Sequence, residues 1–204
     1  ENIMRLYAKM MYVNILVNQL RGDKARKKTA REEIWQAQYG ETYRIQEGFD
    51  TPESRSLRTL AYKNLLMAEK TTRIRGVFSP SIVCTDFDMD SVREYLCQLE
   101  SANMYVHPYG GKIFEFDIFP VYRNFCDTSI PSSGLFIDHF FSPGALRKLS
   151  RGVLPSEPDL FRYSIYQELS VDRTRCEILL KTNATFGPLQ QPLSLKKQYS
   201  FRNE

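Results

Sequence analysis

The sequence predicts an α+β fold, with N-terminal helices packed on a mostly antiparallel β-sheet. Apolar residues recur at three- and four-residue steps through the first 70 residues, which is typical of amphipathic helices. After residue 71, short apolar runs alternate with turn residues, and Tyr and Phe, which suit half-buried strands, become frequent. We therefore expect a basic helical region over 1–70 and a β-rich α+β body over 71–204, together forming one compact domain.

Three helices are expected in the N-terminal region. Residues 1–20 carry an apolar stripe on one helix face. Thr29 and Glu32 form a capping box, which predicts the start of a second helix. Thr51 before Pro52 places a cap residue ahead of a proline in the first helical turn, so it predicts a third start. The expected ranges are 1–20, 30–39 and 51–70.

The β-rich body should consist mainly of hairpins. Gly110 and Gly111 readily adopt the positive φ angles that a tight turn needs, so they predict a hairpin turn. Ser91 and Glu94 form another capping box, which predicts a helix that ends near residue 102. The expected strands cover 73–78, 82–84, 104–107, 112–119, 135–141, 161–169 and 175–186, and a short helix covers 143–151.

Charge is unevenly distributed along the chain. The net charge is +6 over residues 1–76, −5 over 77–160 and +3 over 161–204, within a total of +4. Closely spaced cations release counterions from a phosphate backbone, so nucleic-acid binding through the basic segment 21–31 is an alternative function. We favour a solvated basic connector for this segment, and the basic and acidic parts of the chain could equally complement each other within the fold. The basic residues are Lys24, Arg26, Lys27, Lys28 and Arg31.

The first helix carries side chains of the kind that interfaces favour. Methionine adapts to irregular surfaces, and aromatic residues are enriched at contacts between proteins. Because the sequence contains no recognisable catalytic constellation, we interpret the chain as a non-enzymatic interaction or assembly domain. It would dock on a protein partner or on a copy of itself, unless the helix packs on its own sheet. The expected contact residues are Met4, Tyr7, Met10 and Met11.

Three aspartates spaced by single residues follow the apolar run at 82–84. Carboxylates at this spacing can share a hard divalent cation. The segment from Asp86 to Asp90 resembles the first motif of the haloacid-dehalogenase phosphatases, although Met89 and Asp90 replace the small residue and the hydroxyl of that motif. The resemblance implies a metal-dependent phosphoryl-transfer enzyme at Asp86 and Asp88, which is a further alternative. We favour a structural role, in which Asp88 or Asp90 caps the helix expected after it.

Other polar residues of the β-rich body are interpreted as structural. The chain has two histidines, His107 and His139, too few for a histidine-rich metal site. Glu115 and Asp117 share one face of an expected strand, which we expect to be solvated. The sequence therefore predicts no catalytic residue, no metal and no cofactor.

Cysteine spacing and hydropathy indicate the cellular compartment and whether the chain crosses a membrane. The four cysteines are widely spaced, so we expect small buried thiols and favour a reducing, cytoplasmic compartment. Charged and amide side chains interrupt the apolar stretch 3–20, so no transmembrane span is expected in this chain. Because the sequence begins at Glu1 rather than at methionine, we expect a processed chain or a piece of a longer one.

Overall fold

The computed structural model describes residues 2–44, 51–74, 76–127, 134–153, 159–187 and 189–202, and the structural statements below concern these residues. The helices are α1 (Asn2–Gln19), α2 (Lys24–Ala37), α3 (Pro52–Thr72) and α4 (Pro143–Leu149), with a 3₁₀ turn, η1, at Gly40–Tyr43. The strands are β1 (Ser81–Thr85), β2 (Glu94–Gln98), β3 (Ala102–His107), β4 (Lys112–Ile118), β5 (Arg123–Asn124), β6 (Gln167–Asp172), β7 (Glu177–Phe186) and β8 (Gln191–Ser200). The predicted α+β class, with helices before the sheet, is confirmed.

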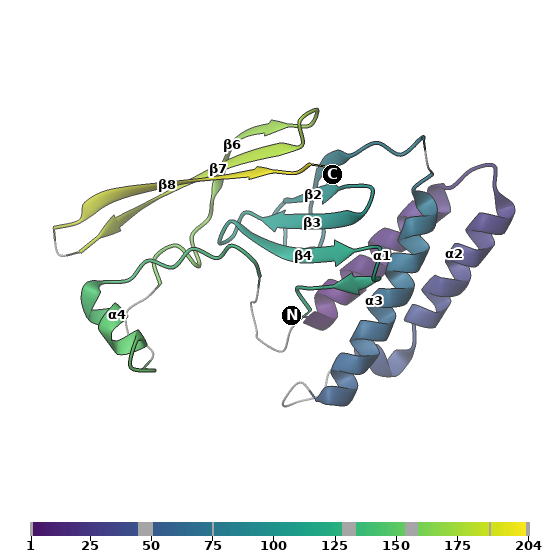
Figure 1. Ribbon diagram of the computed structural model, residues 1–204, viewed down its shortest axis with the longest axis horizontal. Coiled ribbons are helices and arrows are strands. Elements are labelled where there is room, and N and C mark those ends of the chain that lie inside the picture. The colour runs from purple at the N-terminus through teal and green to yellow at the C-terminus, as the bar shows by residue number, and fades with distance from the viewer. Residues whose placement is uncertain are drawn as a thin grey trace.

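The elements form a helical layer, a central sheet and a second sheet (Figure 1). The central sheet is antiparallel, in the order β1-β2-β3-β4-β5, and α1 and α3 cover one of its faces. The second sheet contains β6, β7 and β8, and its long β7–β8 hairpin extends away from the helices. Helix α2 packs on α1 and α3, on the side away from the sheet.

Three apolar cores lie within and between these layers. The helices share a core of their own, to which α2 contributes Ala30, Ile34 and Ala37. A small, largely aromatic core lies between α1 and the central sheet and is built around Tyr105 and Phe114. The largest core joins the two sheets, and its buried members are Ile82, Tyr95, Cys97, Leu99, Val106, Ile113, Cys126, Tyr166, Cys176, Ile178, Leu180, Tyr199 and Phe201.

The first residues of the helices show which predicted capping signals are used in the structure. Thr51 accepts a hydrogen bond from the backbone N–H of Ser54 at 3.1 Å, so the predicted cap of α3 is confirmed. Helix α2 begins earlier than the sequence predicts, because Asp23 accepts from the N–H of Arg26 at 2.9 Å. Thr29 therefore lies inside the helix, and its hydroxyl donates to the carbonyl of Ala25 at 3.2 Å. The basic run lies on this helix and is not a connector.

The helix predicted from Ser91 to residue 102 is wrong, because β2 and the start of β3 occupy this segment. Every residue of β2 is buried, with Tyr95 and Cys97 in the core between the sheets and Leu96 in the core beneath α1. Burial on both faces removes the alternation that identifies a strand. Ser91 has a φ of +71°, which a helix does not allow.

Two of the predicted strands are also wrong. The described residues of 73–78 form a turn, in which the N–H of Phe78 donates to the carbonyl of Ile74 at 2.8 Å. Leu135 makes one isolated bridge, to Ile113, and the rest of 135–141 joins neither sheet. The described residues of both segments lack the partner strand that a β ladder requires, and the side chains of Val77 and Phe136 are mostly exposed.

The hairpin of β3 and β4 turns as predicted at Gly110 and Gly111, whose φ angles are +78° and +51°. A Cβ at Gly110 would lie 2.6 Å from the carbonyl oxygen of Arg162, so glycine also allows a close approach. The N–H of Gly110 donates to Ser164 O at 2.8 Å, and Tyr109 forms a bridge with Ile165. The turn therefore positions the segment that precedes β6 beside the end of β3.

Within the described part of the chain, no helix combines the length and the hydropathy needed to cross a membrane.

Candidate functional site

Lys9 of α1 is the centre of a buried charge network between the helices and the central sheet. Its ammonium group donates to Asp117 Oδ2 at 2.7 Å and to the Tyr105 hydroxyl at 3.1 Å, and it lies 2.8 Å from Glu69 Oε2. All four side chains are buried. Burial alone would lower the pKa of Lys9, but the adjacent Asp117 and Glu69 outweigh it and raise the pKa well above its usual value. Lys9 is therefore a permanent cation inside the protein.

Asn103 and Arg73 extend the network towards α3. The amide of Asn103 donates to Glu69 Oε1 and to Asp117 Oδ2, each at 3.0 Å. The guanidinium of Arg73 donates to Glu69 Oε1 at 3.1 Å. These cations and hydrogen bonds outweigh the effect of burial and lower the pKa of Glu69 below its usual value. Each carboxylate therefore has its charge matched by a neighbour.

Glu115 lies beside Asp117 on the same face of β4, and that face is covered by the helices. The Tyr62 hydroxyl donates to Glu115 Oε1 at 2.8 Å, and the Asn124 amide donates to Asp117 Oδ1 at 2.8 Å. Burial, reinforced by the charge of Asp117, raises the pKa of Glu115 to about 8. The prediction that Glu115 and Asp117 line a solvated strand face is wrong, because α1 and α3 cover that face.

This network joins the layers rather than meeting a ligand. Its carboxylates and its lysine are almost fully buried, and its hydrogen bonds run between α1, α3 and the strands β3, β4 and β5. A buried ion pair contributes little net stability, but it defines which surfaces fit together. We therefore conclude that the network positions the helices on the sheet and does not bind a ligand.

A second polar group, the acid–histidine cluster, consists of Asp88, Asp90, Glu94 and His107. One ligand-type atom from each residue lies within 4.8 Å of the others. His107 Nε2 lies 3.3 Å from Asp90 Oδ2 and 3.6 Å from Glu94 Oε1. Asp90 is half exposed, whereas Glu94 and His107 are buried. The cluster therefore opens to solvent on the side of the loop that carries Asp90.

Backbone N–H groups fix the carboxylates of the cluster. The N–H of Phe87 donates to Glu94 Oε2 at 2.6 Å, and the N–H of Val92 donates to Asp90 Oδ1 at 2.7 Å. Two residues that flank Asp90, Met89 and Ser91, have φ angles of +64° and +71°. Non-glycine residues seldom adopt this conformation, so the loop is bent tightly around Asp90.

The protonation states of the cluster follow from its burial. Desolvation, with the charges of Asp88 and Asp90 beside it, raises the pKa of Glu94 to about 8, against a backbone hydrogen bond that lowers it. Desolvation and the charge of Asp90 raise the pKa of Asp88, and desolvation lowers the pKa of His107. Three acids and a neutral imidazole therefore share this space without a positive charge of their own.

The hydrogen bonds of His107 define its tautomer. Its Nδ1 accepts from the backbone N–H of Tyr109 at 3.0 Å. In a neutral imidazole the proton must then lie on Nε2, the atom that faces Asp90 and Glu94. His107 thus donates a hydrogen bond to Asp90 Oδ2 and orients that carboxylate, whereas Glu94 Oε1, 3.6 Å from Nε2, lies beyond hydrogen-bond distance.

The sequence located part of this cluster. It singled out Asp86, Asp88 and Asp90, but Asp86 accepts a hydrogen bond from the N–H of Ser91 at 3.1 Å and is not one of the four clustered residues. Because no helix follows the loop, the predicted capping role of Asp88 or Asp90 is wrong. Glu94 and His107 were missed as members of a site. No local pattern joins them, because they meet only through the β2–β3 register, which pairs Tyr95 with Val106 and thus places Glu94 opposite His107.

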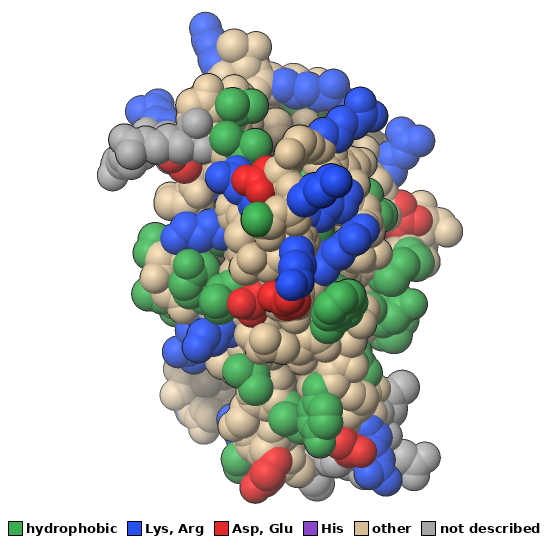
Figure 2. Space-filling view, turned by 90° about the vertical axis from the view of Figure 1, so that its right-hand side faces the viewer, with side chains coloured by type: hydrophobic (Ala, Val, Ile, Leu, Met, Phe, Trp, Pro, Cys, Tyr) green, Lys and Arg blue, Asp and Glu red, His purple; other side chains and the backbone are tan. Residues whose placement is uncertain are grey.

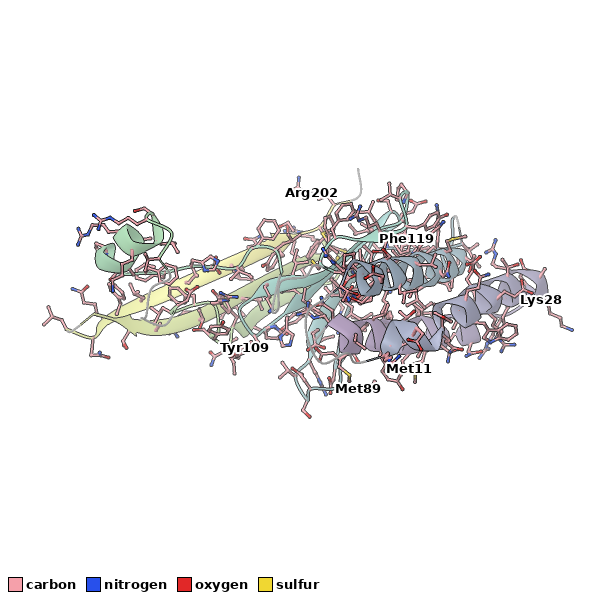
Figure 3. The ribbon with its side chains drawn as sticks, turned by 90° about the horizontal axis from the view of Figure 1, so that it is seen from below. Met11, Lys28, Met89, Tyr109, Phe119 and Arg202 are labelled. Carbon is pink, nitrogen blue, oxygen red and sulfur yellow. The ribbon has the colours of Figure 1, made fainter. Side chains whose placement is uncertain are left out.

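An exposed aromatic surface lies next to the cluster. The rings of Tyr109 and Tyr163 are 6.2 Å apart and inclined by 45°, and both are more than two-fifths exposed. The guanidinium of Arg162 lies 5.3 Å from the Tyr163 ring, and the ring of His107 lies 6.3 Å from that of Tyr109. Figure 3 shows Tyr109 on the same side of the molecule as Met89, which belongs to the loop of the cluster, and Phe119 on the opposite side.

The basic side chains of α2 lie on the helical end of the molecule, where Figure 2 shows Lys and Arg gathered over the upper part of the view. Lys27 donates to the carbonyls of Asn18 and Leu20, at the end of α1, and Arg31 donates to the Asn18 side chain at 2.8 Å. Lys28 Nζ lies 3.8 Å from Glu32.

Arg26 and Lys24 complete this basic segment. Arg26 lies 3.6 Å from the Asp23 carboxylate, and Lys24 is exposed at the first position of α2. Four of the five cations therefore contact residues of their own chain. Nucleic-acid binding by this segment stays a prediction.

The four residues predicted as a contact surface on α1 do not share one face. Met4, Tyr7 and Met11 are exposed, by 56%, 41% and 36%. Met10 is buried in the core of the helices, so its assignment to a surface contact is wrong. The helix presents one side to α2 and α3, and Met10 lies on that side.

His139, the second histidine, lies outside the cluster. Its Nδ1 is 2.5 Å from Asp159 Oδ2, and its ring stacks on Phe141 at 6.1 Å. Half of the His139 side chain is exposed. This carboxylate–imidazole pair provides a matched control for the experiments below.

No family model matches the sequence, and neither does any curated protein. The fold is similar to the crystal structure of a 4-alpha-glucanotransferase from Thermococcus litoralis, with a TM-score of 0.72 and 18% sequence identity. The similarity covers 98% of this chain and 33% of that enzyme, so the chain spans about a third of its length. Our interpretation of the chain as a non-enzymatic assembly domain is contradicted, because almost the whole chain shares the fold of part of an enzyme.

Proposed function

We propose that this chain is part of an enzyme that acts on α-glucans and that the surface of Tyr109 and Tyr163 binds the glucan. The observation that carries the proposal is the similarity of 98% of the chain to part of a 4-alpha-glucanotransferase. At 18% identity this similarity concerns the fold, so the function needs its own support from the residues of this chain.

The aromatic surface supplies that support. One face of a pyranose ring presents C–H bonds, and the face of an aromatic ring carries the negative end of its quadrupole. Tyr109 and Tyr163 offer two such faces side by side, and their exposure leaves room for a sugar chain. The Arg162 guanidinium beside Tyr163 adds donors for sugar hydroxyls. The hairpin turn at Gly110 holds both tyrosines in place through its contacts with the segment around Ser164.

Replacing both tyrosines by alanine is expected to weaken binding of maltoheptaose at least tenfold, which corresponds to a loss of about 1.4 kcal/mol. The reason is that both stacking faces disappear while the backbone contacts of the hairpin remain. Isothermal titration calorimetry of maltoheptaose into the parent protein and into Tyr109→Ala/Tyr163→Ala measures the change.

Tyr39→Ala is the matched control, because Tyr39 is at least as exposed as the two tyrosines but follows α2 at the helical end. It should bind maltoheptaose like the parent protein. A β-linked oligosaccharide of the same length tests whether the surface prefers the α-linkage. The proposal fails if the parent protein does not bind maltoheptaose, or if Tyr39→Ala loses as much affinity as the double variant.

A further inference from the structure

Two carboxylate oxygens in the acid–histidine cluster have no hydrogen-bond partner although they are buried. They are Glu94 Oε1 and Asp88 Oδ1. The Glu94 side chain is fully buried, and its Oε1 points to the same space as the Asp90 carboxylate and His107. A buried acceptor without a partner costs free energy, so these atoms indicate that something else satisfies them.

In Glu94 and Asp90, one oxygen of the carboxylate is already fixed by the backbone. Glu94 Oε2 accepts from the N–H of Phe87, and Asp90 Oδ1 accepts from the N–H of Val92. Each group thus has one oxygen held by the backbone and one turned to the common space. Such preorganisation is what a cation site requires, since the ligands do not have to rearrange when the ion binds.

The chemistry of the atoms selects the class of ion. Because Nδ1 of His107 accepts from the N–H of Tyr109, its Nε2 carries the proton and cannot also donate a lone pair to a metal. The ligands are then the carboxylate oxygens of Asp88, Asp90 and Glu94. Oxygen ligands alone favour a hard cation over zinc or copper.

The number of carboxylates favours calcium among the hard cations. One ligand-type atom from each of the four residues lies within 4.8 Å of the others, so the carboxylates are close enough to share one ion. Ca²⁺ accepts several carboxylates in a flexible geometry, whereas Mg²⁺ demands a near-ideal octahedron, keeps several waters and is usually bound through one or two carboxylates.

We propose that Asp88, Asp90 and Glu94 bind one Ca²⁺ ion and that His107 positions the Asp90 carboxylate through its Nε2–H. The half-exposed side of Asp90 leaves room for water molecules to complete the coordination shell. The ion would tie the loop before β2 to the end of β3. This inference is independent of glucan binding, because its test measures the ion alone.

Calorimetric titration of Ca²⁺ into chelator-treated protein should show one ion bound per chain. Glu94→Gln removes a charge and a ligand at unchanged shape, so it should lower the affinity at least tenfold. Asp90→Asn should lower it as well, and its amide oxygen still accepts from the Val92 N–H if the loop needs that contact to fold. His107→Ala should weaken binding by roughly tenfold and keep the stoichiometry of one, as expected for a positioning residue.

Asp159→Asn is the matched control, since Asp159 also lies beside an imidazole but outside the cluster. It should bind Ca²⁺ like the parent protein. The proposal is overturned if the parent protein binds no Ca²⁺, or if Glu94→Gln and Asp90→Asn bind it unchanged. Tighter binding of Zn²⁺ that disappears in His107→Ala would also overturn it, because the imidazole would then be a direct ligand.

Discussion

Lys9→Met is expected to lower the free energy of unfolding by about 3–5 kcal/mol. The substitution preserves most of the side-chain volume, but it leaves Asp117 and Glu69 buried without the cation that lies 2.7 and 2.8 Å from them. Neither carboxylate can reach water, because both are fully buried. Urea unfolding followed by circular dichroism measures the loss.

Lys28→Met is the matched control for this prediction. Lys28 is exposed and pairs with Glu32 within one helix, so its replacement should change stability by less than about 1 kcal/mol. Lys9→Met/Asp117→Asn should recover part of the loss, because it removes the buried charge of Asp117, whereas Glu69 keeps the Arg73 guanidinium at 3.1 Å. A Lys9→Met protein as stable as the Lys28→Met protein would show that the network does not hold the helices on the sheet.

Glu115→Gln is expected to remove part of the pH dependence of stability. The pKa of Glu115 is about 8 in the folded protein and has its ordinary value in the unfolded chain, so the folded state keeps a proton that the unfolded state has released between those values. Stability must therefore fall as the pH rises through this window, by up to about 1.4 kcal/mol per pH unit for one proton. The neutral amide of Glu115→Gln does not titrate. The free energy of unfolding of this variant should therefore increase relative to that of the parent protein as the pH rises.

The measurement is the free energy of unfolding at several pH values between 5 and 8, with a chelator present to exclude cations. Glu94 also has a pKa of about 8, so Glu94→Gln should remove a second and similar contribution. Glu100→Gln, which alters an exposed carboxylate, should leave the slope unchanged. Parallel curves for Glu115→Gln and the parent protein would contradict a protonated Glu115.

Local signals were sufficient for the start of α3 and for the turn between β3 and β4. The cap at Thr51 and the glycines of the 110–111 turn act within a few residues, and the structure confirms both. The signal at Ser91 and Glu94 failed because the same residue types serve a different purpose. Glu94 accepts its backbone hydrogen bond from Phe87, and Ser91 lies in a tight bend before a strand.

The polar sites could not be predicted in full, because their members meet through tertiary contacts. Lys9 and Asp117 are 108 residues apart in the chain, and no pattern in the sequence pairs them. From the sequence alone, Glu115 and Asp117 of β4 were therefore interpreted as lining a solvated strand face. The aspartates before β2 were visible as a group, but their neighbour His107 joins them only through the pairing of β2 with β3.

The burial of strand β2 determines how its backbone amides exchange with solvent. All its residues are buried, because it is enclosed by α1 on one side and by the second sheet on the other, and β1 and β3 flank it. Its amide protons can exchange with deuterium only when the layers separate, so they should be the last to exchange and should report global opening. The amides of β8, at the edge of its sheet and mostly exposed, should exchange early.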